Sequence, residues 1–446
     1  MTAVTAAHSA TAMTDEPAAL CAAVVAEAGA DERIEVFARR VRTTMTRLAP
    51  SDAVHDQVSD GWMIGVRSLV GDQLGLATGN VLDEQGLARI LADARRARAE
   101  APRGHTAQDR GDTQPPTSGP ARPVPDSSTP AQLRDIAAAA HRAAGTDRLT
   151  TVTVGSTRRV VVHQDSAGRS ELHEQTEAQL HIRSAVRGLD AGQGARIRSR
   201  LADLPVGDAV TEYTRSVSAL TGPPAPAGRP DWILLSPLLV ARIVGRISRA
   251  FLRSAHRAHP WEPGDVIGVG RQNLVLVDDA ATHRGPGVIP VDDEGVPRRR
   301  TVLLDRGRVA GLLGCTGAGP STGSAQWGGW DSEIAPATAA CYLEPTSERA
   351  LPEPERLPGN GFIAEDLRGF RGGLDFSTSR IECELTGVVM RDAQTVGTGR
   401  VAVSAAPGEF LGAFDEVLSG TEFYRIQGLH GGSWCLLNGS VVHGEC

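Results

Sequence analysis

The sequence contains no lysine, so all 46 of its basic residues are arginine. This absence excludes every mechanism that depends on a lysine side chain, including a Schiff base, the lysine of a P-loop and a Ser-Lys dyad. Alanine and glycine are abundant in the same chain. We therefore interpret the missing lysine as a bias of coding composition and not as a sign of arginine chemistry.

Cysteine is also scarce, and its six positions form no CxxC pair: Cys21, Cys315, Cys341, Cys383, Cys435 and Cys446. The pattern predicts neither a disulfide framework nor a zinc ribbon, and we expect reduced thiols. The sequence shows no signal peptide and no run of about 20 apolar residues, which predicts a cytoplasmic protein without a membrane helix. A net charge of −7 offers no basic surface for nucleic acid.

The 446 residues suffice for two or three hydrophobic cores. We expect a flexible tail at 1–17, an N-terminal α+β segment at 18–100, a linker or mobile loop at 101–130, a central segment of helix and strands at 131–222 and a β-rich domain at 223–446. The predicted fold class is α+β, in which N-terminal α/β-type segments precede a C-terminal antiparallel, barrel-like β domain.

Periodicity and capping residues predict the elements of this fold. Helices are expected at 18–29, 83–99, 130–144 and 236–253, and strands at 35–48, 62–67, 73–77, 149–154, 158–164, 171–186 and 232–235. His173-Glu174 with His181 invites a metallopeptidase interpretation. Alternate residues around them are apolar, however, which predicts a half-buried strand with one wet face. The two imidazoles would then lie about 26 Å apart, too far to share a metal ion.

The most informative stretch is an acidic turn formed by Asp292, Asp293, Glu294 and Gly295, which precedes a hairpin that reverses at 305–307. Gly307 can adopt the positive φ that a tight reversal requires. One interpretation of the acidic turn is a structural turn neutralised by the arginines at 298–300. The other is a substrate cleft, with its carboxylates serving as metal ligands or as a general base.

Several segments in this order resemble the TldD/PmbA family. The acidic turn, Pro297 and the hairpin match a D-D-E-G element of that family. Residues 319–323 resemble its G-x-S-T-G segment, and Tyr342-Leu343-Glu344-Pro345 resembles a later strand. Residues 385–398 and 431–442 resemble further strands of the family. The resemblance covers the last half of the chain well and the first half loosely.

In catalytic members of the TldD/PmbA family, the helix that corresponds to the one expected at 236–253 carries an H-E-x-x-x-H motif, which binds zinc together with a later cysteine. The corresponding window here, 242–250 (RIVGRISRA), contains no His, Glu, Asp or Cys. The resemblance therefore implies a metal-free TldE/PmbA-like subunit with no catalytic residues and no cofactor of its own. Zinc is expected in a TldD-type partner subunit. The pair would process an extended peptide, for example in peptide or natural-product maturation.

The remaining histidines and cysteines predict no metal site. His256 and His259 stand beside Pro260, which ends the helix, and we expect them to be solvated. The C-terminal region lacks a rigid frame that could gather its four candidate ligands around an ion, namely His430, Cys435, His443 and Cys446.

Two other functions are compatible with the sequence. A non-catalytic binding or scaffold protein in a biosynthetic pathway would retain the fold and lose the peptidase association. A metal-independent enzyme would use the carboxylates of the acidic turn, but no candidate nucleophile lies beside a histidine in the sequence. A neighbouring gene for a TldD-type protein with an intact motif would favour the paired subunit over the scaffold.

Overall fold

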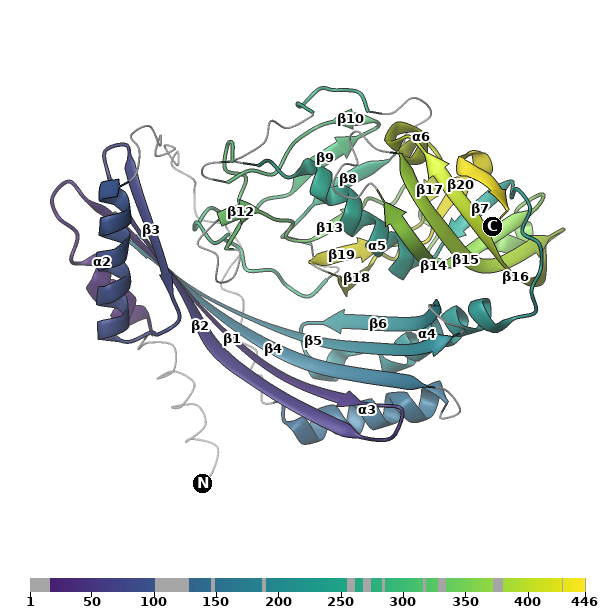
Figure 1. Cartoon of the computed structure of the whole chain (residues 1–446), viewed down its shortest axis with the longest axis horizontal. Helices are drawn as coiled ribbons and strands as arrows, with labels where there is room; N and C mark the ends of the chain where they lie inside the picture. The colour runs from purple at the N-terminus through teal and green to yellow at the C-terminus, as the bar shows by residue number, and fades with distance from the viewer. Residues whose placement is uncertain are drawn as a thin grey trace.

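The computed structural model describes residues 17–100, 128–145, 149–186, 190–254, 261–267, 274–282, 285–315, 318–327, 334–371, 380–426 and 428–445. A long curved sheet carries helices along its outer side, and a β-rich C-terminal domain lies over the opposite side of the sheet (Figure 1). The predicted tail at 1–17 and linker at 101–130 fall almost wholly outside the described residues.

The N-terminal sheet has six antiparallel strands in the order β3-β2-β1-β4-β5-β6. Its strands are β1 (Arg33–Leu48), β2 (Val54–Val70), β3 (Gln73–Gly79), β4 (Thr150–Asp165), β5 (Ser170–Val186) and β6 (Asp190–Arg198). The pairing of β1 with β4 joins the predicted segments at 18–100 and 131–222 into one sheet.

Residue parity separates the two faces of this sheet, because side chains alternate along a strand. Even-numbered apolar residues such as Val36, Val154 and Leu180 are buried beneath the helices. The covering helices are a helix at 17–25, α2 (Glu84–Glu100), α3 (Pro130–Ala144) and α4 (Val206–Thr221). In β3 the register reverses this parity, and Ala77 packs with Val66 beneath α2. On the other strands, odd-numbered residues form the face that meets the C-terminal domain.

The structure confirms most elements predicted in the N-terminal half and corrects two. α3 begins at Pro130, as predicted. The structure adds a capping box formed by Thr129 and Gln132. The strands predicted at 149–154 and 158–164 are one strand, β4, because 155–157 keep the pairing with both neighbours. The predicted parity of β5 is partly wrong. Leu172 is 42% exposed, whereas Glu177 is buried because two arginines pair with it.

The C-terminal domain contains a seven-stranded sheet in the order β17-β20-β7-β14-β15-β16-β21 and a six-stranded sheet in the order β10-β9-β8-β13-β19-β18. Their strands are β7 (Trp232–Leu235), β8 (Val275–Asp278), β9 (Thr301–Asp305), β10 (Arg308–Val309), β13 (Cys341–Leu343), β14 (Gly361–Arg371), β15 (Ile381–Arg391), β16 (Gln394–Ala405), β17 (Phe414–Val417), β18 (Glu422–Arg425), β19 (Leu429–Gly432), β20 (Cys435–Asn438) and β21 (Val442–Glu445). A separate pair is β11 (Ala325–Trp327) with β12 (Ile334–Pro336). Most pairings are antiparallel, and the assembly is barrel-like without closing, which confirms the α+β class.

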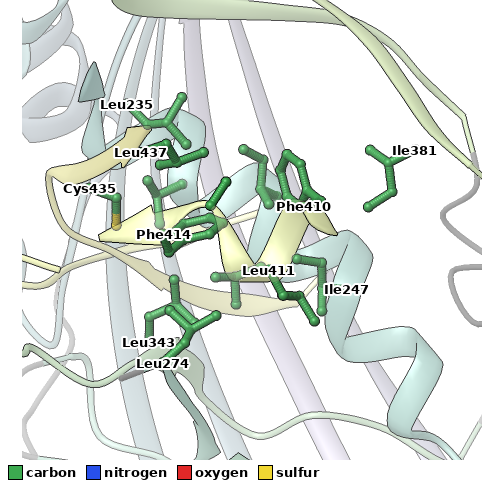
Figure 2. Close-up of a cluster of buried hydrophobic side chains, with 14 of the residues drawn as sticks. Leu235, Ile247, Leu274, Leu343, Ile381, Phe410, Leu411, Phe414, Cys435 and Leu437 are labelled. Atoms are coloured by element: carbon green, nitrogen blue, oxygen red, sulfur yellow. The ribbon is translucent and has the colours of Figure 1, made fainter. Parts of the chain in front are cut away.

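Helix α5 (Pro237–Ile247) and the 3-10 turn η2 (Ser248–Phe251) fill the space between these sheets. Pro237 occupies the first turn as predicted, although Ser236 makes no side-chain capping bond. Ile247 at the end of the helix lies in a core that includes aromatic side chains from α6 (Pro407–Gly412) and β17 (Figure 2). No helix in the described part of the chain has the length and apolar character needed to cross a membrane.

The remaining short elements are the 3-10 turns η1 (Leu201–Asp203), η3 (Pro354–Arg356) and η4 (Gly439–Val441). The predicted hairpin is confirmed, with positive φ at Arg306 (48°) and Gly307 (79°) between β9 and β10. The side chain of Asn438 caps η4 by accepting a hydrogen bond from the backbone N–H of Ser440.

Candidate functional site

The acidic turn lies against the odd-numbered face of the N-terminal sheet and is closed to solvent. Asp292 is 0% exposed and Glu294 is 1% exposed. The Asp292 carboxylate accepts backbone N–H bonds from Glu294 (2.9 Å), Val296 (2.8 Å) and Ala325 (2.9 Å). Burial raises the pKa of Asp292 to about 6, and Arg298 opposes that rise. Its contacts are therefore those of a carboxylate that shapes a turn.

Two arginines from the N-terminal sheet neutralise the other carboxylates of the turn. Arg39 of β1 donates to Asp293 at 3.3 Å. Arg67 of β2 donates to Glu294 and, at 3.5 Å, to Glu35. Burial disfavours the charge on Arg67, but Glu294 and Glu35 outweigh it and raise the pKa of this guanidinium. The acidic turn is thus an ionic contact between the two parts of the chain.

Trp327 and Gly295 extend this contact. The indole of Trp327 stacks on Phe37 with ring centroids 6.3 Å apart, and its Nε1–H donates to the carbonyl of Asp293 at 3.2 Å. Gly295 has φ +70°, and a Cβ atom there would lie 2.3 Å from the ring of His163. A larger residue at this position would adopt an unfavourable positive φ and would displace the ring of His163.

The arginines that neutralise the turn differ from those that the sequence indicates. Arg298 donates to the backbone carbonyls of Val291 (3.1 Å) and Gly323 (3.2 Å), and Arg300 pairs with Glu344. The expectation of neutralisation by 298–300 is therefore met only in part. The positive charge of Arg298 opposes the pKa rise of Asp292, whereas Arg39 and Arg67 form the ion pairs with Asp293 and Glu294. Burial without solvent access supports the structural interpretation of the acidic turn over a substrate cleft.

An open cleft of about 450 Å³ lies elsewhere on the odd-numbered face, toward β6. Its floor consists of odd-numbered residues of β4, β5 and β6, namely Thr153, Gln179, His181, Arg183, Gln193, Ala195 and Ile197. Leu238 and Arg242 of α5 and residues 424–426 at the end of β18 face this floor. The volume is within the range of ligand-binding pockets.

Buried carboxylates hold the arginines of this cleft in place. Arg242 donates to Asp366 at 2.6 Å. Arg196 donates to Glu212 at 2.8 Å, and the hydroxyl of Tyr424 donates to the same carboxylate at 2.8 Å. These charge-assisted bonds fix the guanidinium orientation, so the cleft presents prearranged hydrogen-bond donors.

Arg425 and Arg159 share one buried carboxylate, that of Glu177. Burial alone would raise the pKa of Glu177, but Arg425 and Arg159 outweigh it and hold that pKa below its ordinary value. The alternation of β5 predicts a wet face that includes His181 and Arg183. Nothing in the sequence predicts that residues about 250 positions away, at 424–426, close over it.

The side chains on α5 do not fit a zinc ion, which needs several His, Cys or carboxylate ligands. Within the described residues, no three of these side chains gather to form a metal site. The Nδ1–H of His430 donates to the carbonyl of Ile426 (3.1 Å), and Cys435 donates to the carbonyl of Ser433 (3.6 Å). Burial raises the pKa of Cys435, which keeps its thiol protonated. The side chains of His256, His259, His443 and Cys446 lie outside the described part of the structure.

His430 gives the protein a predicted sensitivity to acid. Its ring is 2% exposed and packs against Gly245 of α5. Burial lowers the pKa of His430 from 6.5 to about 4. The neutral ring therefore contributes stability that is fully present above pH 6.5 and is lost as the pH falls toward 4.

The predicted measurement is denaturant unfolding of the wild type and His430→Gln at about pH 7.5 and pH 4.5. The difference in unfolding free energy between the two proteins should fall by about 2 to 3 kcal/mol at the lower pH. Gln cannot titrate in this range, so the change of this difference with pH reports the titration of His430. A difference that stays constant between the two pH values would contradict the assignment.

Comparisons with known proteins identify the class of this fold. Residues 233–441 match the family described as "PmbA/TldA metallopeptidase C-terminal domain". The C-terminal domain of the chain therefore belongs to this family, which confirms the resemblance seen in the sequence. A search of curated proteins finds no match.

Solved structures share the whole fold at low sequence identity. TldE from Thermococcus kodakarensis has a TM-score of 0.72 and 16% identity, covering 92% of this chain and 96% of that protein. A protein from Bacteroides thetaiotaomicron described as a modulator of DNA gyrase has a TM-score of 0.73 and 13% identity, covering 97% and 99%. A protein from Thermotoga maritima with the same description has a TM-score of 0.70 and 14% identity, also covering 97% of this chain and 99% of that protein.

Proposed function

We propose that this chain is a metal-free, TldE/PmbA-like subunit that pairs with a zinc-bearing TldD-type subunit and completes a peptide-processing chamber. One observation carries the proposal. A cleft lies against α5, and the helix presents Leu238 and Arg242 to it, yet the sequence from 242 to 250 contains no metal-ligating side chain. A zinc-activated water must then come from the partner subunit.

The geometry of β6 supports a role in holding an extended peptide. β6 is the last strand of its sheet, and its odd-numbered residues line the cleft. The backbone N–H groups of Gln193 and Ala195 on this edge already donate to the side chains of Ser216 and Glu212. The proposed contacts to an extended peptide are therefore those of the alternate side chains that line the cleft. The proposed role of this subunit is therefore to bind and select the peptide. The scaffold alternative keeps the same cleft without a peptidase partner.

Pairing with a TldD-type protein is the test of this proposal. We expect the two proteins, co-expressed from the same genome, to elute together in size-exclusion chromatography and to remain associated on dilution. An obligate pairing should bury well over about 1,600 Å². If the chain stays separate from every TldD-type protein in its genome, the scaffold function replaces this one.

A further inference from the structure

We infer that the cleft selects a peptide segment that carries a carboxylate, either an acidic side chain or a free C-terminus. The inference rests on the proposed function and adds the substrate class to it. Its basis is the charge of the cleft lining, which contains four arginines, Arg183, Arg196, Arg242 and Arg425, and no Asp or Glu among the described lining residues.

Buried carboxylates next to the cleft balance only part of the positive charge of its lining. Asp366 and Glu212 each pair with one cleft arginine. Glu177 is the shared partner of Arg425 and of Arg159, so one carboxylate faces two guanidinium groups. This arrangement leaves net positive charge beside the cleft although the whole chain carries −7. An anionic group that enters the cleft is therefore attracted more strongly than a neutral group of the same shape.

Arg183 is the arginine best placed to bind such a group. It is exposed on the wet face of β5, and in the part of the chain that the structure describes no ion pair joins it to another residue. Gln193 of β6 is the cross-strand neighbour of Arg183, so its side-chain amide lies on the same face beside the guanidinium. A guanidinium without an internal partner can give a carboxylate two parallel hydrogen bonds.

The spacing along β5 suits an extended peptide. Arg183 and His181 point to the same face and are separated by about 7 Å, the repeat of alternate residues in an extended chain. A carboxylate bound at Arg183 would then place the next side chain on that face near His181. Leu238, Ile197 and Ile426 line the same cleft and can cover the aliphatic part of a glutamate or aspartate side chain.

Peptide binding to the purified full-length chain tests the inference. The probes are three fluorescent peptides of one length and otherwise neutral sequence. One has internal Glu residues and an amidated C-terminus, one has Gln in their place with an amidated C-terminus, and one has Gln with a free C-terminal carboxylate. We expect at least one carboxylate-bearing peptide to bind about five- to tenfold more tightly than the neutral one at low salt, and the preference to shrink at higher ionic strength. The peptide that gains affinity identifies the source of the carboxylate.

Variants place the effect in the cleft. Arg183→Gln should remove most of the preference, so that the carboxylate-bearing and neutral peptides bind with similar affinity, whereas Arg183→Lys should retain part of the preference because the charge remains. Arg96→Gln is the matched control, since Arg96 is an exposed arginine on α2 with a side-chain exposure of 68%.

Each contrary outcome has a distinct meaning. Equal affinity for all three peptides would overturn the carboxylate preference and leave the proposed peptide role standing. A preference that survives in Arg183→Gln would overturn the assignment to this cleft. If none of the peptides bound, both the preference and the peptide-selecting role would be overturned, while pairing with a TldD-type subunit is decided separately by chromatography.

Discussion

The Glu294→Gln variant is expected to lose about 3 to 5 kcal/mol of unfolding free energy, although the substitution keeps the shape of the side chain. Arg67 is 7% exposed and pairs with Glu294. Without the carboxylate, the remaining ion-pair partner of the guanidinium among the described residues is Glu35, at the longer distance of 3.5 Å. A buried charge that loses its partner cannot recover its hydration, so the cost greatly exceeds that of a surface pair. Chemical denaturation monitored by circular dichroism measures the unfolding free energies of the variant and the wild type.

Two comparisons make this result specific. Glu353→Gln breaks the exposed ion pair with Arg356, whose side chain is 74% exposed, and should change stability by less than about 1 kcal/mol. The double variant Arg67→Met, Glu294→Met should be more stable than Glu294→Gln alone, because an apolar pair leaves no unpaired charge. If Glu294→Gln unfolded at the same denaturant concentration as the wild type, the acidic turn would not be the ionic contact described here.

Local rules in the sequence are sufficient to predict much of this fold. Pro237 begins α5, Thr129 and Gln132 begin α3, and Gly307 reverses the hairpin, because each residue type has a conformational preference that acts over a few positions. Segment boundaries such as the division within β4 are harder to predict. There Gly155-Ser156-Thr157 resembles a turn, but pairing on both sides keeps the strand extended.

The partners of charged residues are the part that the sequence alone could not predict. Three arginines at 298–300 follow the acidic turn directly, yet Arg39 and Arg67 neutralise it from more than 200 positions away. The same holds for Glu177, which lies on the predicted wet parity of β5 and is buried by Arg159 and Arg425. Such ion pairs depend on how the N-terminal sheet packs against the C-terminal domain. The hydrophobic periodicity of a short stretch of sequence does not predict that packing.

The absence of metal ligands on α5 leads to the second large effect. Under the proposed function, the isolated chain is expected to show no peptidase activity, because the described residues that line its cleft form no metal-ligand set that could activate water. When the TldD-type partner supplies zinc and this chain supplies the arginine-lined cleft, cleavage of an extended peptide should appear. We expect the rate to rise by at least about a thousandfold over either subunit alone, since a metal-bound hydroxide and a positioned peptide each contribute several orders of magnitude.

The most direct test of this account is a peptide-cleavage assay on three samples: this chain alone, its TldD-type partner alone, and the complex of the two. The account predicts that an unstructured peptide is cleaved rapidly only by the complex, and that a chelator which removes zinc from the partner abolishes the reaction. Cleavage by this chain in the absence of the partner would contradict the central claim that the chain is the metal-free half of a pair. Undiminished cleavage by a complex whose partner has substituted zinc ligands would contradict it as well.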